Sequence, residues 1–542
     1  MDPIISVNTV DYVIIGAYVA VTIIVGYGLK KYMRTGEDFF LSGRSLPTWI
    51  TGLAFISANL GALEVIGMIA NSAKYGISTV HFYWVGAIPA MVFLGIFMMP
   101  FYYESKVKSV PEYLKLRYNN ATHALNAISF AVMTVLMSGI SMYAMALLFK
   151  SMLGWSLTAS IMLSAFVVLL YVFWGGLSSS IYNEVIQFFL IWLGLLPIVS
   201  IGLVASGGFS GLARRLPETF VHAWRYMGSN GQNPLGVDWL GVVLGLGFVL
   251  SFGYWTTDFL VVQRALAAKD LSAAQRTPLF ASFPKMLVPL IVVTPGLIAI
   301  AMLPEFQTSA GQTPNYNNAL VLLMAHYLPN GVLGLAITAL LASFMSGMAG
   351  NVTAFNTVWT YDIYGSYIKK GMPDEHYLKM GKYATVFGVL ISIGTAYIVQ
   401  SFPNLMDYMQ LIFSFFNAPL FATFLLGMFW KRATPWGGFF GLLAGISVAA
   451  IHYFLLYRTG VITYASDMAA NFYQAWWAWL TDFTVTILVS LVTKKKADEK
   501  LRGLVYGLSS KTKERAAKWF LRPELWGSLA LLAALVLNVI FW

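Results

Sequence analysis

Cysteine is absent from the 542 residues of this chain, and charged residues are scarce at 11% of the sequence. Without cysteine the chain can form no disulfide, no thiolate metal site and no cysteine nucleophile. A soluble protein carries about 25% charged residues, so this composition excludes an ordinary soluble enzyme. Apolar residues take the place of charge, because 58% of the chain is hydrophobic and 15% is aromatic. The composition therefore predicts a membrane protein.

Motifs for several kinds of chemistry are also missing. The sequence contains no P-loop, so we expect no ATP, and it contains neither an HExxH nor a GxSxG motif. The histidines are too scattered to predict a metal cluster, and they are His81, His123, His222, His326, His376 and His452. We therefore expect a carrier and no enzyme. A membrane-embedded enzyme and a passive channel stay as rival interpretations.

Fourteen stretches are apolar and long enough to cross a bilayer, which takes about 20 residues each. They cover residues 11–30, 47–73, 76–104, 122–149, 156–177, 179–206, 238–263, 277–303, 330–364, 383–401, 405–430, 434–457, 470–493 and 523–541. The chain has 34 Lys and Arg against 23 Asp and Glu. In so apolar a sequence this surplus predicts loop charge that holds a membrane orientation, with no nucleic-acid partner.

The orientation follows from where the basic residues fall. When the N-terminus is placed outside, 27 basic residues lie in cytoplasmic segments, 6 lie in outer loops, and Lys285 lies within a span. Cytoplasmic loops of membrane proteins are enriched in Lys and Arg. The sequence therefore predicts a multi-pass protein of the cell membrane, inner or plasma, that contacts the lipid bilayer and has both termini on the extracytoplasmic side.

Small and polar residues interrupt two of the apolar stretches. The interruptions are Ile56–Ala62, and Gly245–Gly247 followed by Ser251–Trp255. Secondary transporters often consist of two inverted halves, each opening with a helix broken near mid-membrane, where freed carbonyls bind an ion. Small residues that only allow close helix packing are the alternative. We expect one transmembrane domain over 1–542, with an extra helix at 11–30, a first repeat at 47–206, an inverted second repeat at 238–430 and three further helices over 434–542.

Ionisable side chains fall within several of the predicted spans. Glu64, Glu184, Asp258 and Lys285 all do so, and such groups are costly in lipid unless they are paired or face a cavity. A structural ion pair explains Lys285 with one acid, whereas a polar cavity explains all four residues. Asp482 lies in an otherwise aromatic span, has no partner that the sequence identifies, and is expected at an interface.

Six short motifs occur in an order that resembles the solute:sodium symporter family, which includes the sodium/glucose and sodium/galactose cotransporters. The motifs are Glu37–Pro47, Ser57–Asn59, Trp174–Leu177, Val262–Lys269, Met345-Ser346 followed by Tyr361–Tyr364, and Phe429–Arg432. The resemblance extends over about residues 35–435. It implies an all-α leucine-transporter-type fold of two inverted five-helix repeats, with one helix before and three after. It also implies sodium-coupled symport of a small polar solute by alternating access, with Na+ as the coupling ion.

The resemblance implies a sodium site at the first broken helix. Its ligands would be backbone carbonyls at Ser57 and Leu60 together with groups of Ser343 and Ser346. A hard cation takes several oxygen ligands, and serines three residues apart share one face of a helix. Gly347 stands where many relatives carry a second hydroxyl, which implies one ligand fewer.

A second sodium ion is not expected. Members of the family with a further sodium pair that missing hydroxyl with an acidic residue, which here matches Glu184. We therefore expect one sodium, with Glu184 as the candidate for a second ion or for coupling.

The resemblance to sugar cotransporters also implies a substrate site. The predicted substrate-binding residues are Asn59, Glu64, Tyr83, Ser251, Tyr254, Trp255, Lys285, Met406, Asp407 and Gln410. Met406 and Asp407 match the outer part of the pocket, and Tyr254 matches a tyrosine that lies under the sugar ring as an inner gate. Buried hydroxyl groups of a ligand need donors and acceptors at fixed places, which these residue types supply.

Two positions depart from the sugar-carrier pattern. A glutamate of the second core helix aligns with Tyr83, and Glu64 stands where sugar carriers have glutamine or histidine. Either the carboxylate has moved across the pocket or the substrate has changed class. Lys285, the only cation of the predicted pocket, can neutralise Glu64 but leaves little positive charge for an anion. We therefore expect a neutral sugar or polyol, with a zwitterionic or cationic solute, a carboxylate and proton-coupled uptake as alternatives. The oligomeric state is not predicted.

Overall fold

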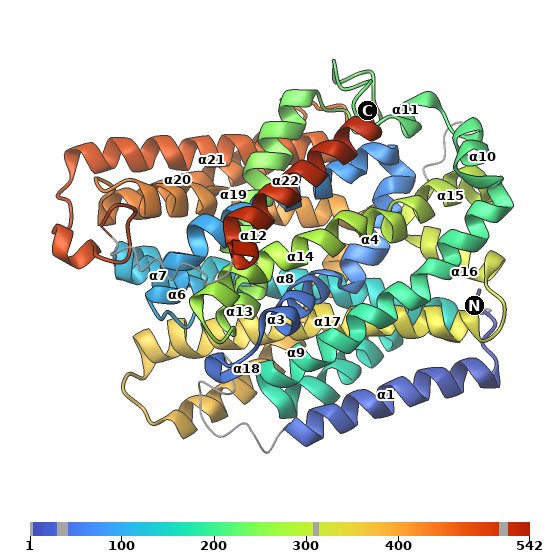
Figure 1. Cartoon of the computed structure of the whole chain (residues 1–542), viewed down its shortest axis with the longest axis horizontal. Coiled ribbons are helices and arrows are strands. Elements are labelled where there is room, and N and C mark those ends of the chain that lie inside the picture. The colour runs from blue at the N-terminus through green and yellow to red at the C-terminus, as the bar shows by residue number, and fades with distance from the viewer. Residues whose placement is uncertain (1–3, 30–41, 307–313, 509–518) are drawn as a thin grey trace.

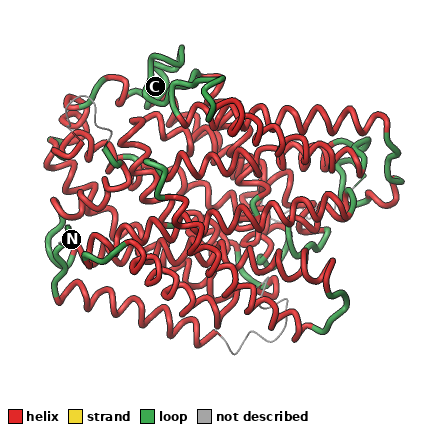
Figure 2. Tube along the Cα trace, turned by 180° about the vertical axis from the view of Figure 1, so that it is seen from behind, coloured by secondary structure: helices red, strands yellow, loops and turns green. Residues whose placement is uncertain are grey.

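The computed structural model describes residues 4–29, 42–306, 314–508 and 519–542. Within these ranges the chain is helical and has no strand; a single parallel bridge joins Leu46 to Ala268. Most long helices run along the long axis of the molecule (Figures 1 and 2). The prediction of an all-α protein is confirmed. The Glu37–Leu41 part of the first motif lies outside the described residues.

The N-terminal half of the chain contains the extra helix and the first predicted repeat. Its helices are α1 (Thr9–Leu29), α3 (Thr48–Asn59), α4 (Ala62–Tyr75), α5 (Ile88–Phe93), α6 (Met99–Glu104), α7 (Val110–Arg117), α8 (Asn120–Leu153) and α9 (Leu157–Ser206). Short 3-10 or π-helical turns complete this half, and they are η2 (Ser42–Arg44), η3 (Gly76–Val80), η4 (Phe82–Ala87) and η5 (Leu94–Met98).

The second predicted repeat follows a loop that carries two short helices, α10 (Gly208–Arg215) and α11 (Glu218–Val221). Its helices are α12 (Phe252–Thr257), α13 (Phe259–Leu266), α14 (Leu271–Val292), α15 (Thr294–Met302), α16 (Ala319–Tyr327), α17 (Val332–Thr357), α18 (Asp374–Val399) and α19 (Leu405–Phe429). Its 3-10 and π-helical segments are η6 (Gly241–Ser251), η7 (Pro304–Phe306), η8 (Tyr316–Asn318) and η9 (Val358–Ile368). The remaining elements are α20 (Pro435–Ala450), η10 (Ile451–Tyr457), α21 (Asp467–Val492), η11 (Asp498–Leu501), η12 (Trp519–Leu521) and α22 (Pro523–Ile540).

Local sequence signals explain where several helices begin and end. The side chains of Ser109 and Asn119 accept hydrogen bonds from the backbone N–H groups of Glu112 and Thr122, at 3.1 and 2.8 Å, and so begin α7 and α8. These bonds satisfy N–H groups that have no partner inside the helix. Gly154 ends α8 in a left-handed conformation with φ 66°, which glycine adopts without steric cost.

Two membrane helices are broken. α3 and α4 meet at 55°, and the segment of η6 and α12 meets α13 at 49°. The first break lies at Leu60 and Gly61, within the predicted interruption. The second lies at Asp258, whose backbone is extended at φ −75° and ψ 118°, so the expectation of a break within Gly245–Trp255 is wrong by a few residues.

Gly245 and Gly247, in the second interruption, lie where neighbouring segments pack closely. A side chain on Gly245 would meet the backbone of Phe472 on α21 at 2.8 Å, and one on Gly247 would meet Val85 at 3.1 Å. These glycines therefore allow helices to approach closely, which is the packing role of small residues in membranes. The chain bends instead where the Asp258 side chain can cap a new helix.

The number of membrane spans stays a prediction. In the described part of the chain ten helices are long and apolar enough to cross a membrane, or up to twelve when each broken pair is counted as one span. Thr9–Val25 and Leu157–Leu169 are shorter apolar segments. Helical geometry also continues through the predicted connection at residue 178, because α9 contains both stretches that were expected at 156–177 and 179–206.

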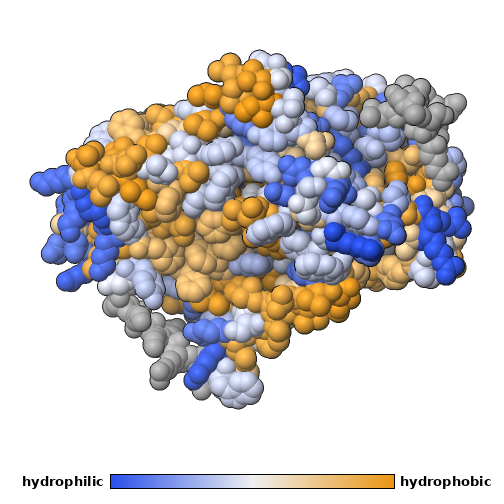
Figure 3. All heavy atoms as spheres, turned by 90° about the horizontal axis from the view of Figure 1, so that it is seen from above, coloured by the Kyte–Doolittle hydropathy of each residue, from blue (hydrophilic) through white to orange (hydrophobic). Residues whose placement is uncertain are grey.

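The arrangement of loops is consistent with the predicted topology. The N-terminal end of α1, α10, α11 and α16 lie at one end of the long axis, whereas α6 and α7 lie at the other (Figure 1). Hydrophilic residues gather at both ends, and much of the apolar surface lies between them (Figure 3). A band of apolar surface between polar ends is what a bilayer requires.

Candidate functional site

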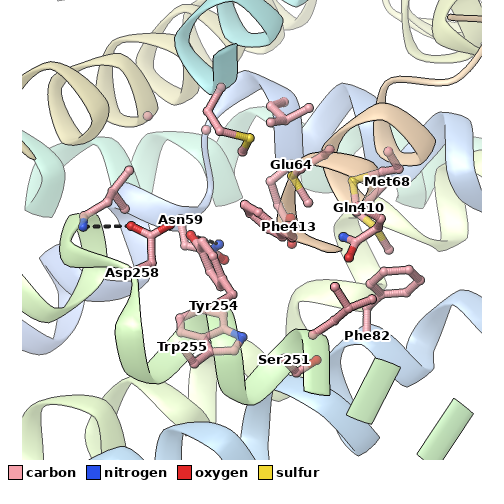
Figure 4. A pocket seen from close by; sticks show the side chains of 18 of the residues that line it. Asn59, Glu64, Met68, Phe82, Ser251, Tyr254, Trp255, Asp258, Gln410 and Phe413 are labelled. Atoms are coloured by element: carbon pink, nitrogen blue, oxygen red, sulfur yellow. Dashed lines mark hydrogen bonds between the residues drawn. The ribbon is translucent and has the colours of Figure 1, made fainter. Parts of the chain in front are cut away.

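A cavity lies between the two broken helices. The first break contributes Asn59 and Glu64, the second contributes Ser251, Tyr254 and Trp255, and other helices close the ring (Figure 4). Nine of the ten predicted substrate-binding residues line this cavity, and they are Asn59, Glu64, Tyr83, Ser251, Tyr254, Trp255, Lys285, Met406 and Gln410. Residues as far apart in the sequence as Asn59 and Gln410 therefore line one cavity. Small-molecule sites are typically built in this way.

An ion pair between Lys285 and Glu64 lies in the lining of the cavity. Lys285 Nζ lies 3.0 Å from Glu64 Oε1, and Tyr83 donates a hydrogen bond of 2.7 Å to the same oxygen. Lys285 also donates to Asn59 Oδ1. The ammonium lies over the rings of Tyr83 and Trp255, at 4.8 and 5.3 Å from their centroids, and such rings attract cations. Both charges are thus compensated within the protein.

Tyr254 joins the first break to the second. Its hydroxyl accepts a hydrogen bond of 2.9 Å from Asn59 Nδ2. The ring stacks on Phe413 with centroids 4.8 Å apart and meets Trp255 edge-on at 5.1 Å. Asn59 therefore contacts Lys285 through its carbonyl and Tyr254 through its amide nitrogen, so that this one side chain couples the charged and aromatic parts of the cavity.

Uncharged polar groups in the cavity are free to bind a ligand. Gln410 is 4% exposed and Ser251 is 7% exposed. Neither forms a side-chain hydrogen bond within the part of the chain that the structure describes, although both line the cavity. Buried polar groups normally have partners. A ligand with hydroxyl groups could satisfy the amide and hydroxyl of these two residues.

The residues expected at the sodium site meet at the first break. Ser343 Oγ donates a hydrogen bond of 2.5 Å to the backbone carbonyl of Leu60, and the hydroxyls of Ser57 and Ser346 lie 3.2 Å apart. All three serines are fully buried. The break frees carbonyl oxygens and α17 supplies hydroxyls, which together are the oxygen ligands that a hard cation takes.

The glycine at position 347 has a steric explanation. A side chain there would lie 2.9 Å from the Cα atom of Gly61, so α17 approaches the break by direct backbone contact. A hydroxyl-bearing residue would push the two segments apart. The sequence predicted only that this position supplies one ligand fewer to sodium. Gly61, which lies against Gly347, was the sequence feature that could have indicated a close approach of the two segments.

Glu184 lies in a second buried ion pair. Arg264 Nη2 lies 2.6 Å from Glu184 Oε1, Arg264 Nε lies 3.3 Å from Oε2, and Ser180 donates to Oε1 at 2.6 Å. Both charged side chains are fully buried. The Arg264 side chain is buried within α13. Arg264 thus binds the Glu184 carboxylate, the candidate for a second ion, through two contacts.

Asp407 is the predicted substrate residue that does not line the cavity. Its carboxylate accepts hydrogen bonds from Lys74 at 2.7 Å and from Tyr75 at 3.1 Å. Lys74 also lies 3.7 Å from Asp467 of α21. The residue therefore ties α19 to the end of α4, beside the cavity wall that Met406 forms.

Asp482 and Asp258 complete the set of acids within the membrane helices. Asp482 is fully buried and accepts hydrogen bonds from Thr423 at 2.7 Å and Thr486 at 2.8 Å, so the expected interface is the one between α19 and α21. Its spacing of four residues from Thr486 was a usable signal. Asp258 and Asn351 line the cavity but were absent from the predicted set.

Comparison with known proteins gives the family. Residues 39–445 match the sodium:solute symporter family. The chain is 29% identical over 464 residues to a sodium/glucose cotransporter of Vibrio parahaemolyticus, which covers 82% of this chain and 85% of that protein. It is 28% identical over 548 residues to the sodium/myo-inositol cotransporter of Homo sapiens, which covers 91% of this chain and 75% of that protein.

Two solved structures share the fold. A Na+-coupled sialic acid symporter in a substrate-bound, outward-open state superimposes with a TM-score of 0.75 at 20% identity, over 90% of this chain and 99% of that one. The nucleobase-cation-symport-1 transporter Mhp1, in a closed conformation with bromovinylhydantoin bound, gives a TM-score of 0.52 at 10% identity, over 85% and 96%. The predicted leucine-transporter-type fold is confirmed.

The family match covers more than half of the chain and includes both broken helices. The relatives it groups are transporters, and the family couples solute movement to sodium. The chain therefore belongs to the sodium:solute symporter family, and it is a multi-pass membrane carrier that moves a solute together with sodium as the coupling ion, and no enzyme.

Proposed function

We propose that this carrier imports a neutral sugar or polyol. The observation that carries the proposal is the ion pair of Lys285 and Glu64, whose charges are 3.0 Å apart and compensate each other. Lys285 is the only cation that lines the cavity among the described residues. A free carboxylate on a substrate would find no unpaired cation there and would face Glu64 in a medium of low dielectric constant, where like charges repel strongly.

Uncharged polar groups support the same class of substrate. Gln410 and Ser251 offer an amide and a hydroxyl that have no hydrogen-bond partner among the described residues. Tyr254 and Trp255 offer aromatic faces. A polyhydroxy ligand needs donors and acceptors on its edges and tolerates an aromatic surface against its C–H face. The names of the relatives, which transport glucose and myo-inositol with sodium, favour this class.

We propose that sodium binds at the first break, with the carbonyls of Ser57 and Leu60 and the hydroxyls of Ser343 and Ser346. Asn59 lies in the same turn, between the two carbonyls, and contacts both Lys285 and Tyr254. An ion that fixes the turn would therefore also fix the side chain that organises the cavity. This contact gives a physical route by which sodium favours solute binding.

A solute panel tests the proposal. Purified protein in proteoliposomes is given labelled hexoses, inositols, lactate and a sialic acid, each with a sodium gradient, a proton gradient or none. We expect sodium-dependent uptake of a hexose or inositol. Uptake of lactate or sialic acid with none of the neutral solutes would reject the proposal, as would uptake that follows the proton gradient alone.

Glu64→Gln refines the result, because glutamine keeps the shape of the side chain and removes its charge. Loss of hexose or inositol binding in this variant would mean that the carboxylate contacts the solute or holds Lys285 in place. A gain in the binding of an anion would show that Glu64 is what excludes anions.

A further inference from the structure

Asp258 is a buried carboxylate at the second break, and it forms no ion pair among the residues that the structure describes. It lies between α12 and α13, is 4% exposed and lines the cavity (Figure 4). One oxygen, Oδ1, accepts a hydrogen bond of 2.9 Å from the backbone N–H of Leu260. That bond caps α13, and it leaves the other carboxylate oxygen available.

The nearby cations are already engaged by other acids. Arg264 is paired with Glu184 at 2.6 Å, and Lys285 is paired with Glu64 at 3.0 Å. Asp258 forms no ion pair within the described residues. The partial positive charge at the start of α13 offsets only part of a full negative charge. A buried carboxylate without a counter-charge is strongly unfavourable, so this position favours a cation.

Asn417 is a buried amide next to Asp258. Asn417 of α19 is 1% exposed, and neither its oxygen nor its nitrogen forms a hydrogen bond within the described residues. The Asn417 amide lies near enough to the Asp258 carboxyl to act on it as a donor, although it does not reach hydrogen-bond geometry. α12 packs closely against it, because a side chain on Gly253 would lie 2.6 Å from the Asn417 backbone oxygen. The Asn417 oxygen has no partner among the described residues, and an unsatisfied buried acceptor points to a ligand.

A third polar residue, Asn351, reaches the cavity that Asp258 lines. It belongs to α17, is 7% exposed, lines the same cavity and forms no side-chain hydrogen bond among the described residues. Its neighbour Gly350 packs against Leu260, since a side chain there would lie 3.1 Å from the leucine Cδ1 atom. α17 thus reaches the start of α13, two residues from Asp258.

We propose that Asp258, Asn351 and Asn417 form a second sodium site, at the break in the second repeat. A carboxylate and two amide oxygens are the hard oxygen ligands that such a cation takes. The inference rests on the proposed sodium-coupled function and goes beyond the single ion expected at the serines. The first break binds its ion with uncharged oxygens, and the second binds its ion with a carboxylate.

Equilibrium binding of radiolabelled sodium to the purified full-length protein, without solute, tests the site. We expect two ions per chain in the natural protein and one in Asp258→Asn. Asparagine can still accept the hydrogen bond from Leu260, so α13 keeps its cap. Asn351→Ala and Asn417→Ala should each lower the affinity for the second ion by roughly 10-fold or more, the usual effect of losing a supporting group at a metal site.

Asp482→Asn is the matched control, because Asp482 is an equally buried carboxylate that two threonines satisfy. It should still bind two ions. The same number of ions in Asp258→Asn as in the natural protein would overturn the second site, and this is also the result if Asp258 holds a proton. Ser346→Ala separates the two proposals: if it leaves binding unchanged while Asp258→Asn loses an ion, the serine site fails and the second site stands.

Discussion

Two buried ion pairs of this carrier use the same chemistry for different ends. Lys285 and Glu64 face the cavity through a single contact of 3.0 Å, and their side chains are 2% and 10% exposed. Arg264 and Glu184 are fully enclosed and share two contacts, the shorter of 2.6 Å. In the pair at the cavity, one carboxylate oxygen and the aromatic neighbours stay accessible to a ligand. The enclosed pair is not accessible to a ligand, and it joins α9 to α13.

The comparison teaches that burial of a charge in a membrane protein does not identify a binding residue. The sequence placed Glu64 and Glu184 in the same category, as acids within apolar stretches. What separates them is the partner: a flexible ammonium bends toward several acceptors, while a planar guanidinium binds one carboxylate through two bonds. The first arrangement can rearrange around a solute and the second cannot.

Arg264→Ala is expected to have the largest effect on folding. It leaves Glu184 charged and enclosed, and removing one partner of a buried pair typically costs about 3–5 kcal/mol. We expect little folded protein and a large drop in the thermal unfolding temperature measured in detergent. Arg264→Ala combined with Glu184→Gln should recover part of the stability. A single variant as stable as the natural protein would mean that the enclosed pair does not hold α9 and α13 together.

Lys285→Ala is expected to abolish coupled uptake while leaving more folded protein than Arg264→Ala. The pair faces the cavity, so water can reach Glu64 after Lys285 is removed. The loss of folding free energy should therefore be smaller than the cost of about 3–5 kcal/mol that is typical of a broken, fully buried pair. The measurement is sodium-driven uptake alongside the unfolding temperature. Normal transport by Lys285→Ala would show that Lys285 has no part in the pocket.

Ser346→Ala should weaken the response to sodium with a modest effect on stability. The variant removes one hydroxyl from the first break, where Ser57 and Ser346 oxygens lie 3.2 Å apart. Loss of one ligand or supporting group typically lowers metal affinity about 10–100-fold. The sodium concentration for half-maximal uptake should rise accordingly, and an unchanged value would remove the serine from the proposed site.

Tyr254→Phe should have the smallest effect of the four. It deletes the hydroxyl that accepts from Asn59 and keeps the ring that stacks on Phe413. A hydrogen bond of this kind contributes about 0.5–1.5 kcal/mol, so we expect apparent solute affinity to fall by a few-fold in uptake assays. Tyr254→Ala, which also removes the ring, is the harsher partner variant. Equal losses in both would mean that the hydroxyl matters more than the aromatic face.

Much of the cavity was predicted from the sequence because family motifs give the positions of its residues along each helix. Those motifs do not state which way a side chain turns. Asp407 follows Met406 directly, yet Met406 lines the cavity and Asp407 bonds to Lys74 and Tyr75. Neighbouring residues of a helix point about 100° apart, so adjacent positions can face different surroundings.

The second break shows the same limit for backbone conformation. Glycines at 245 and 247 predicted a break, but they lie within the continuous segment η6 and allow close approach of Phe472 and Val85. A glycine has the same local signature whether it frees the backbone or makes room for a neighbour. The bend lies instead at Asp258, where a side chain can cap the next helix.

The sequence by itself determined the membrane class, the all-α fold, the order of the apolar stretches and the family. Hydropathy and short motifs depend only on residues that are close together in the chain, so they can be read without the structure. Only the tertiary structure decided that Lys285 pairs with Glu64, 221 positions away, that Arg264 occupies Glu184, and that Gly347 meets Gly61. These contacts depend on the rotation and depth of separate helices against one another. That geometry results from packing over the whole bundle, and no local stretch of the chain contains it.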